Sequence, residues 1–418
     1  MTATYQIEIK DVEQAALRLK NVVVNTPLMK NLNISKRLSA NVFLKREDLQ
    51  LVRSYKIRGA YNKISSLSEE ELKNGVVCAS AGNHAQGVAY SCNQLKIKGT
   101  IFMPAPTPKQ KVEQVKMFGE DFVEVVLQGD TFDDSQHIAA DFCKTNHAAF
   151  IHPFDDEKVI EGQATIGLEI LNQTSEDIDY LFLPIGGGGL AAGVASVFKK
   201  LSPNTKIIGV EPHGAPSMSV SIQNKQLTKL NKIDKFVDGA AVKQVGEITY
   251  NICKDVLDDV VTVDEGKVCD TILKLYKRDA IVVEPAGALT ISALDQFADK
   301  IKGKNVVCLV SGSNNDITRM EDIKERAMLY NGLKHYFLVG FPQRAGALKE
   351  FVAEVLGPTD DISYFEYTKK TSREKGFAVV GIELKNQEDF EPLLQRMKDR
   401  HFFGDYLNDN EVLLDILI

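Results

Sequence analysis

Short runs of apolar residues alternate with longer amphipathic segments along most of the chain. The short runs are rich in β-branched residues and predict strands, whereas the longer segments repeat apolar side chains at helical spacing. Strands are predicted at 42–44, 75–79, 99–103, 123–127, 149–152, 181–185, 206–210, 260–263 and 306–311, and helices at 110–118, 131–144, 161–171 and 267–276. Regular alternation of this kind predicts parallel βαβ units, which is an α/β fold with helices on both faces of the sheet.

The pattern changes near residue 325. A charged helix is predicted at 322–330, and the dipeptide Asn331-Gly332 predicts a turn. The order strand, helix, strand, strand, helix, strand follows at 335–341, 346–356, 362–367, 377–384, 386–398 and 411–418. This βαββαβ order is the ferredoxin-like arrangement, in a segment of about 80 residues. We therefore expect a large α/β portion at 1–325, a linker at 326–334 and a separate small domain at 335–418.

Composition narrows the classes of function. The chain has 418 residues, of which 44% are hydrophobic and 26% charged, as is typical of a globular protein with more than one domain. A net charge of -7 without any Lys/Arg-rich run argues against nucleic acid as a partner. The sequence shows no signal peptide and no membrane-spanning segment, so we expect a cytoplasmic protein. The six cysteines and seven histidines are scattered, which predicts neither disulfides nor a metal centre.

Lys56 stands among apolar and aromatic residues at the predicted start of a helix, in the segment LVRSYKIRGA at 51–60. One interpretation is a surface lysine whose stem covers apolar neighbours and whose ammonium lies in water. The other is a Schiff-base lysine with a lowered pKa, which binds a carbonyl cofactor. The second interpretation requires a phosphate cradle, a partner for a pyridine nitrogen and a clamp for a substrate carboxylate.

The candidate phosphate cradle follows the strand predicted at 181–185. Its residues are Gly186, Gly187, Gly188, Gly189 and Leu190. Consecutive glycines can turn their N–H groups around an anion, and the helix that follows adds its positive end. The same stretch fits a dinucleotide-binding fingerprint through Gly186, Gly188 and Ala191, with Glu211 as the ribose-binding acid. Spacing alone leaves pyridoxal phosphate and a nicotinamide cofactor of an oxidoreductase both open.

Two further turns follow predicted strands. The first consists of Ser80, Ala81, Gly82, Asn83 and His84. Its backbone N–H groups suit a free carboxylate, and Asn83 can also reach a phenolic oxygen; the alternative is a helix capped by Ser80 or Asn83. At the second, Ser311 stands at the carboxyl end of the strand predicted at 306–311. It can hydrogen-bond a pyridine nitrogen or belong to a plain turn.

Four blocks occur in a fixed order: SYKIRG at 54–59, SAGNHAQG at 80–87, GGGG at 186–189 and SGSN at 311–314. Together they resemble the threonine dehydratases, also called threonine deaminases, over nearly the whole chain. The resemblance implies a fold type II catalytic portion (tryptophan synthase β-like) with two open α/β subdomains, the smaller inserted at about 46–148. It also implies pyridoxal 5'-phosphate as cofactor, instead of a nicotinamide, and deamination of L-threonine to 2-oxobutanoate and ammonia in isoleucine biosynthesis.

The resemblance also assigns roles to individual residues. Lys56 is similar to the lysine that binds the cofactor and removes the α-proton, and Asn83 to the residue on the phenolic oxygen. The loop at 186–190 would hold the phosphate, and the turn at 80–84 the substrate carboxylate. Ser311 would be the partner of the pyridine nitrogen, where a serine need not keep that nitrogen protonated.

The C-terminal segment resembles a single ACT-like domain of the biosynthetic enzymes, which implies isoleucine and valine as effectors. The family resemblance as a whole implies a homotetramer. Three residues depart from the family pattern, namely Tyr55 for phenylalanine, Ala164 for glycine and Ala345 for proline. Serine dehydratases, serine racemases and β-replacement enzymes share the lysine and the glycine loop, so the substrate stays open between threonine and serine. An amino-acid sensor with a silent catalytic portion is the non-enzyme alternative.

Overall fold

The computed structural model describes residues 5–367 and 375–410. Its contacts divide the chain into two compact units, Met1–Asp316 and Ile317–Ile418. The boundary expected at residue 325 falls inside α14 (Met320–Tyr330), which buries Ile323 and Ala327 and contacts the first strand of the second unit. Within the described ranges, no helix is long and apolar enough to cross a membrane.

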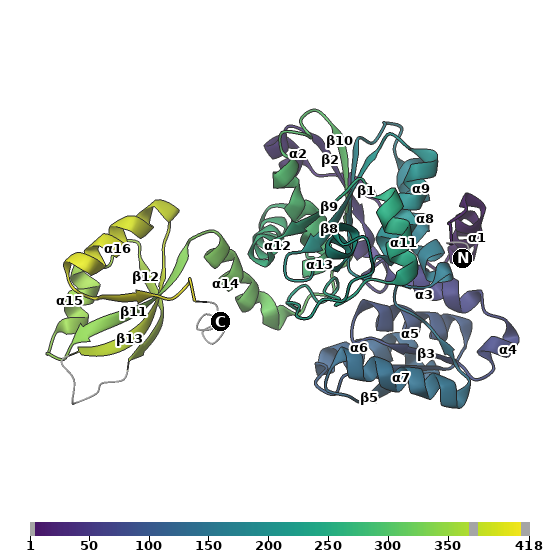
Figure 1. The fold of residues 1–418 in the computed structure, drawn as a ribbon, viewed down its shortest axis with the longest axis horizontal. Helices are drawn as coiled ribbons and strands as arrows, with labels where there is room; N and C mark the ends of the chain where they lie inside the picture. The colour runs from purple at the N-terminus through teal and green to yellow at the C-terminus, as the bar shows by residue number, and fades with distance from the viewer. Residues whose placement is uncertain (1–4, 368–374, 411–418) are drawn as a thin grey trace. The chain divides into compact units, whose positions relative to one another are not determined.

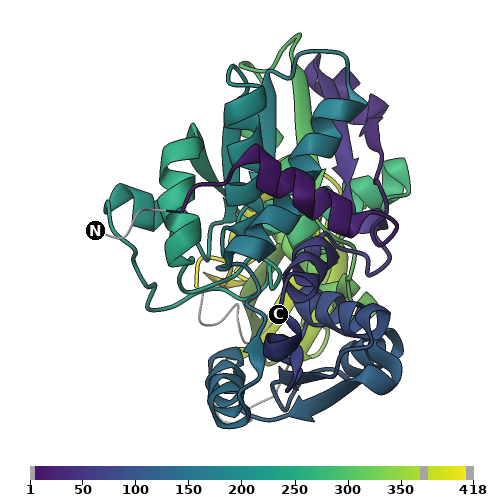
Figure 2. The ribbon, with the colours of Figure 1, turned by 90° about the vertical axis from the view of Figure 1, so that its right-hand side faces the viewer.

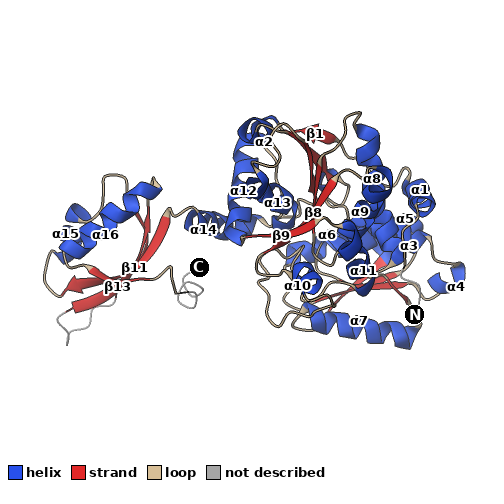
Figure 3. Ribbon diagram, turned by 45° about the horizontal axis from the view of Figure 1, so that its top comes forward, coloured by secondary structure: helices blue, strands red, loops and turns tan. Residues whose placement is uncertain are grey.

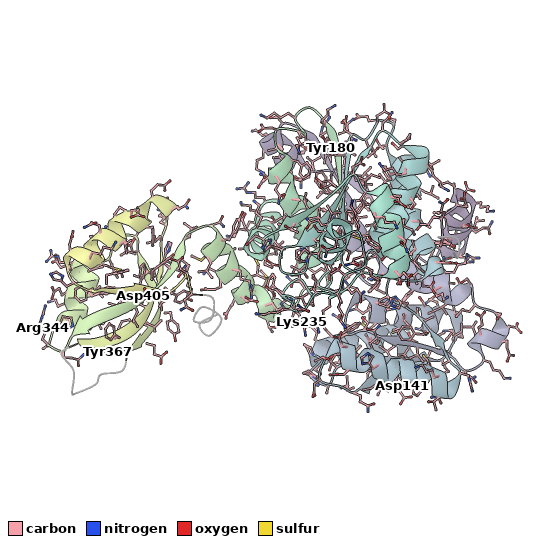
Figure 4. All side chains as sticks on the ribbon, in the orientation of Figure 1. Asp141, Tyr180, Lys235, Arg344, Tyr367 and Asp405 are labelled. Atoms are coloured by element: carbon pink, nitrogen blue, oxygen red, sulfur yellow. The ribbon has the colours of Figure 1, made fainter. Side chains whose placement is uncertain are left out.

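The first unit is built on a six-stranded sheet with the strand order β1-β2-β10-β7-β8-β9. Its strands are β1 (Leu28–Lys30), β2 (Asn41–Arg46), β7 (Tyr180–Pro184), β8 (Lys206–Pro212), β9 (Asp259–Val263) and β10 (Asn305–Val310). All neighbours are parallel except β1, which is antiparallel to β2 and was not predicted. Tyr180, the first residue of β7, lies at the end of this unit farthest from Asp141 of α7 (Phe132–Asn146) (Figure 4). The carboxyl ends of the parallel strands therefore face the smaller subdomain that carries α7.

Helices cover both faces of this sheet, as predicted (Figure 3). One face packs against α1 (Ile9–Leu19), α8 (Glu157–Gln173), α9 (Gly189–Leu201), α10 (Ser217–Gln223) and α11 (Glu247–Val256). The other carries α2 (Leu32–Leu38), α12 (Glu265–Asp279) and α13 (Pro285–Ser292). Side chains of β7 point alternately to the two faces of the sheet. Leu181 and Leu183 pack in the core of the first face, and Phe182 contacts Phe297 on the second. Figure 2 shows α1, in dark purple, lying across the outside of the first layer, where it contacts α8.

The crossing of α8 and α9 accommodates the alanine at position 164. A Cβ on Gly193 of α9 would lie 2.6 Å from the Ile160 carbonyl oxygen and 2.9 Å from the Ala164 nitrogen. The close approach of the two helices is thus provided by Gly193, and Ala164 is fully buried at the contact.

The smaller subdomain is a second parallel sheet with the order β5-β4-β3-β6. Its elements are α3 (Lys56–Ser65), α4 (Glu69–Leu72), β3 (Val76–Ala79), α5 (Asn83–Leu95), β4 (Gly99–Met103), α6 (Lys109–Gly119), β5 (Val123–Leu127), α7 (Phe132–Asn146) and β6 (Ala149–Phe150). Val76 and Cys78 face a core formed with α3, α5 and α6, whereas Val77 and Ala79 face α7. In Figure 1 this subdomain forms the lower body of the first unit. The α/β class expected from the sequence is confirmed in both sheets.

The second unit has the predicted ferredoxin-like order. It comprises β11 (Lys334–Pro342), α15 (Ala347–Glu354), β12 (Asp361–Tyr367), β13 (Lys375–Glu383), α16 (Phe390–Asp399) and β14 (Phe403–Tyr406), with α14 ahead of them. The sheet is antiparallel, in the order β12-β13-β11-β14. The last strand predicted at 411–418 lies outside the described residues. The strand beside β11 is β14, which sequence reasoning missed because Gly404-Asp405 is typical of a turn.

Candidate active site

Lys56 is the first residue of α3, and the backbone before it is tied to the end of β10. Ser54 forms an isolated antiparallel bridge with Gly312, and the Tyr55 N–H donates to the Ser311 carbonyl at 3.2 Å. On the other side, Gly87 lets α5 lie against the Lys56 backbone, since a Cβ at Gly87 would come within 3.1 Å of it. Lys56 is therefore held between the carboxyl end of one sheet and a helix of the other.

The Lys56 amine is turned into the unit rather than toward solvent. Its Nζ donates to the Pro153 carbonyl at 2.7 Å. Burial lowers the pKa of Lys56 to about 8, and the negative charge of Glu284 opposes part of this shift. A fraction of the amine that is far larger than for an ordinary lysine is thus neutral near physiological pH. This environment fits a nucleophilic lysine and not the surface alternative.

The lowered pKa predicts how the amine reacts with an aldehyde. The neutral amine is the reactive form, and its share grows as pH rises through the pKa of about 8. We predict that the cofactor-free protein captures pyridoxal phosphate at a rate that rises through pH 8 and then levels. Stopped-flow absorbance from roughly pH 6 to 10 measures it, and a rate still climbing at about pH 10, as for an ordinary lysine, would contradict the prediction.

The glycine loop joins β7 to α9 and can only be built from small residues. Gly188 has φ +92°, and no side chain caps α9. A Cβ at Gly187 would lie 2.2 Å from the Phe154 ring, and one at Gly189 2.7 Å from the Phe154 carbonyl oxygen. The loop is anchored from behind, because the Thr249 hydroxyl donates to the Gly187 carbonyl at 2.7 Å. An uncapped helix N-terminus of this kind binds anions, phosphate groups included.

Changing Gly188 to alanine should weaken the binding of pyridoxal phosphate. The new Cβ would adopt a strained φ and lie 2.9 Å from the Thr249 side chain, so the loop must shift. We expect the dissociation constant, measured by fluorescence titration of the cofactor-free protein, to rise about tenfold. Gly303→Ala is the matched control, because Gly303 also has positive φ (+71°) but its Cβ would meet nothing within 4 Å. Equal affinities of the two variants would count against the phosphate role.

The turn at 80–84 joins β3 to α5 without a side-chain cap. The N-cap residue is Gly82, and no side-chain oxygen caps the first turn of α5; the alternative in which Ser80 or Asn83 caps the helix is wrong. The Ser80 hydroxyl instead accepts the Gly82 N–H at 3.2 Å. His84 is buried and its Nε2 lies 2.8 Å from the Ile151 carbonyl. Burial lowers the pKa of His84 to about 3, so the imidazole is neutral and leaves the turn to its backbone dipoles.

Ser311 follows β10 and is 2% exposed. Its hydroxyl has no hydrogen-bond partner among the described residues. A buried hydroxyl without a partner costs stability unless a ligand or water satisfies it. The unpartnered hydroxyl, the glycine loop and the uncapped turn therefore fit a cofactor that carries both a phosphate and a ring nitrogen.

Sequence reasoning did not single out Glu284, although it is the buried carboxyl group of this site. It is 5% exposed, and its Oε1 accepts the Asn83 Nδ2 at 2.7 Å. Burial raises its pKa to about 7, as does the negative charge of Asp238. The residue precedes Pro285 at the start of α13, where an acid predicts an N-cap; its side chain does not cap that helix. The only sequence signal was the Glu-Pro-Ala-Gly block that matches the family.

Glu211, the ribose-binding acid of the nicotinamide alternative, is hydrogen-bonded to the protein backbone. Glu211 lies in β8, fully buried, and its carboxylate accepts the backbone N–H groups of Met218 and Ser219 at 2.7 and 2.8 Å. It holds the start of α10 and is not presented to a ribose. The dinucleotide interpretation of the glycine loop therefore lacks its acid.

Comparison with known families agrees with this site. Residues 19–312 match the family described as pyridoxal-phosphate dependent enzymes, and residues 325–417 match the C-terminal regulatory domain of threonine dehydratase. The first unit is thus a pyridoxal-phosphate enzyme in class, with pyridoxal phosphate as its cofactor.

One relative is similar over the full length and two solved structures over most of the chain. The chain is 58% identical to the biosynthetic L-threonine dehydratase of Halalkalibacterium halodurans, over 99% of this chain and 100% of that protein. Threonine deaminase isoform 2 of Solanum lycopersicum is 42% identical with a TM-score of 0.73, over 78% of this chain and 90% of that structure. Maize serine racemase is 30% identical with a TM-score of 0.72, over 78% and 99%. The chain belongs to the biosynthetic threonine dehydratase family.

Proposed function

We propose that this chain converts L-threonine to 2-oxobutanoate and ammonia, as the first step of isoleucine biosynthesis in the cytoplasm. The observation that carries the proposal is the identity of 58% that extends through both units to a biosynthetic threonine dehydratase. The inward-turned amine of Lys56, whose pKa burial lowers to about 8, would supply the base that the reaction needs.

Each part of the site has one task in this reaction. Pyridoxal phosphate, when bound, supplies the electron sink at the amino-acid α-carbon. Lys56 would bind the cofactor and then remove the α-proton of the substrate. Residues 186–190 would hold the phosphate, the Asn83 amide would donate to the phenolic oxygen, and the Ser311 hydroxyl would meet the ring nitrogen. The N–H groups of residues 80–84 would orient the substrate carboxylate.

Serine is the second candidate substrate, because a serine racemase shares the fold at 30% identity. The two substrates differ by one methyl group, worth about 1 to 3 kcal/mol of discrimination. The test compares kcat/KM for 2-oxobutanoate from L-threonine with that for pyruvate from L-serine, and follows D-serine formation by chiral chromatography. We expect threonine to be preferred about tenfold or more, and a preference for serine or net racemisation would overturn the proposal.

We further propose that residues 335–418 form a regulatory domain that binds isoleucine or valine. Its support is the match of residues 325–417 to a threonine dehydratase regulatory domain. The candidate loop lies between β11 and α15, where Gln343 donates from Nε2 to the Tyr367 hydroxyl at 2.7 Å and Ala345 is exposed.

Isoleucine is expected to lower the initial rate at subsaturating threonine and to make the threonine dependence more sigmoidal. Gln343→Ala should weaken this response without changing the rate in the absence of isoleucine, because residue 343 lies outside the catalytic unit. Initial rates across an isoleucine titration measure both. A rate and a cooperativity that isoleucine leaves unchanged would sink the regulatory proposal. Light scattering, with 46.3 kDa per chain, tests the tetramer that we propose alongside it.

A further inference from the structure

Four groups near Lys56 form a continuous chain of hydrogen bonds. The Asn314 side chain donates from Nδ2 to the Val52 carbonyl at 2.9 Å and to the Asn83 Oδ1 at 2.5 Å. Asn83 in turn donates from its own Nδ2 to the Glu284 Oε1 at 2.7 Å. These hydrogen bonds link segments that are more than 200 residues apart in the sequence, since 201 positions separate Asn83 from Glu284. They run from the segment before Lys56 to the start of α13.

The two end groups of this hydrogen-bonded row, the Val52 carbonyl and the Glu284 carboxylate, determine which group donates in every hydrogen bond between them. The Val52 carbonyl can only accept, so it must face the Asn314 amino group and not the amide oxygen. The second hydrogen of that amino group then requires the Asn83 oxygen. The ionised Glu284 carboxylate also only accepts, so it requires the Asn83 amino group. A flipped Asn83 amide would place oxygen against oxygen at Glu284 and nitrogen against nitrogen at Asn314.

One hydrogen of the Asn83 amino group takes part in none of these hydrogen bonds. An amide nitrogen has two hydrogens, and one of them is donated to Glu284. The other is free to donate, and its direction is set because the amide plane is held at both its oxygen and its nitrogen. The Asn314 Oδ1 is buried and has no partner among the described residues, so the same place also offers an acceptor for a ligand or water.

We propose that Glu284 and Asn314 are positioning residues that orient the Asn83 amide so that its free N–H points at the phenolic oxygen of the cofactor. The proposal rests on the proposed function, which places that oxygen at Asn83. In this role Glu284 acts through Asn83 and does not contact the reacting atoms. Its negative charge also raises the pKa of the Lys56 amine, and Glu284→Gln removes that charge while it keeps the acceptor for Asn83.

The surroundings of Glu284 keep it available as an acceptor. Burial and the charge of Asp238 raise its pKa, whereas the Asn83 side chain, the Lys111 ammonium and the Asn314 backbone N–H lower it. The start of α3 also lies near Glu284, which interacts electrostatically with Tyr55 and Lys56 there. With a pKa of about 7, the carboxyl group is largely ionised at about pH 8.5, where the test is made.

A double-mutant cycle on the full-length protein tests the proposal. The dissociation constant of pyridoxal phosphate and the absorption maximum of the bound cofactor are measured for wild type, Glu284→Gln, Glu284→Met, Asn83→Ala and Asn83→Ala/Glu284→Met. Glutamine keeps an acceptor oxygen for Asn83, so Glu284→Gln should bind within about threefold of wild type. Methionine removes the acceptor, so Glu284→Met should bind about tenfold more weakly and shift the absorption maximum.

The cycle separates positioning from a merely structural effect. In the Asn83→Ala background, Glu284→Met should change neither the affinity nor the spectrum further, because nothing remains to be oriented. An equal loss in both backgrounds, or wild-type binding by Glu284→Met, would overturn the proposal. Should Glu284→Met fail to fold, Asn314→Ala enters the same cycle, because it removes the donor to the Asn83 oxygen. Borohydride labelling of Lys56 in the wild type tests the proposed function separately, so failure of one is distinguishable from failure of the other.

Discussion

Lys56→Ala is expected to lower kcat for 2-oxobutanoate formation by about 10⁴-fold. On the proposed function, the variant loses both the amine that would bind the cofactor and the base that would remove the α-proton. Its melting temperature should not fall, because the lost side chain is a partly desolvated cation whose lowered pKa shows that burial already disfavours its charge. Steady-state kinetics with threonine and thermal unfolding of the cofactor-free protein measure the two effects.

Lys63→Ala is the matched control on the same helix. Lys63 follows Lys56 on α3 and forms an ion pair with Asp156 at 2.7 Å. Its kcat should stay within about twofold of wild type. A Lys56→Ala protein that keeps a tenth of the wild-type rate, or a Lys63→Ala protein that loses as much, would refute the assignment of Lys56.

Arg58→Met should produce the largest loss of stability. Arg58 is fully buried, two residues from Lys56, and its guanidinium donates to Glu47 at 2.8 Å and to Glu169 at 2.6 Å. The fully buried Lys45 completes the cluster by donating to Glu169 at 2.6 Å. Removal of Arg58 leaves two carboxylates with one cation inside the unit, which costs about 3 to 5 kcal/mol.

The loss should be visible as a lower thermal midpoint of the first unit. Lys302→Met is the control, because it also removes the cation of an ion pair, Lys302 with Asp299 at 2.8 Å, but at an exposed position. The control should leave the midpoint unchanged. Equal midpoints for Arg58→Met and wild type would show that the buried cluster is not what holds α3 in place.

The fold could largely be predicted because its signals are local. Each buried strand carries its own apolar run, and each turn of the site directly follows a strand, as Ser80 follows β3 and Ser311 follows β10. Parallel strands bring such turns to one edge of each sheet. Where the local signal was weak, the prediction failed: β14 contains Gly404, and β1 is only three residues long.

The contacts that connect the site could not be predicted in the same way. The bond between Glu284 and Asn83 joins residues 201 positions apart, and that between Arg58 and Glu169 residues 111 apart. A single sequence carries no local pattern for such pairs. An arginine within a helix is typical of an exposed helix face, but Arg58 is buried. A glutamate just before a helix is typical of an N-cap, but the Glu284 side chain is buried and does not cap α13. In both cases tertiary packing overrides the local preference.

The role of Lys56 as the cofactor-binding lysine is tested most directly by borohydride reduction of the protein loaded with pyridoxal phosphate, followed by peptide mapping. The proposed function predicts that the label lies on Lys56 and is lost when residue 56 is alanine. A label on another lysine, or a bound cofactor that borohydride cannot fix to the chain, would contradict the role of Lys56 on which the account of this site rests.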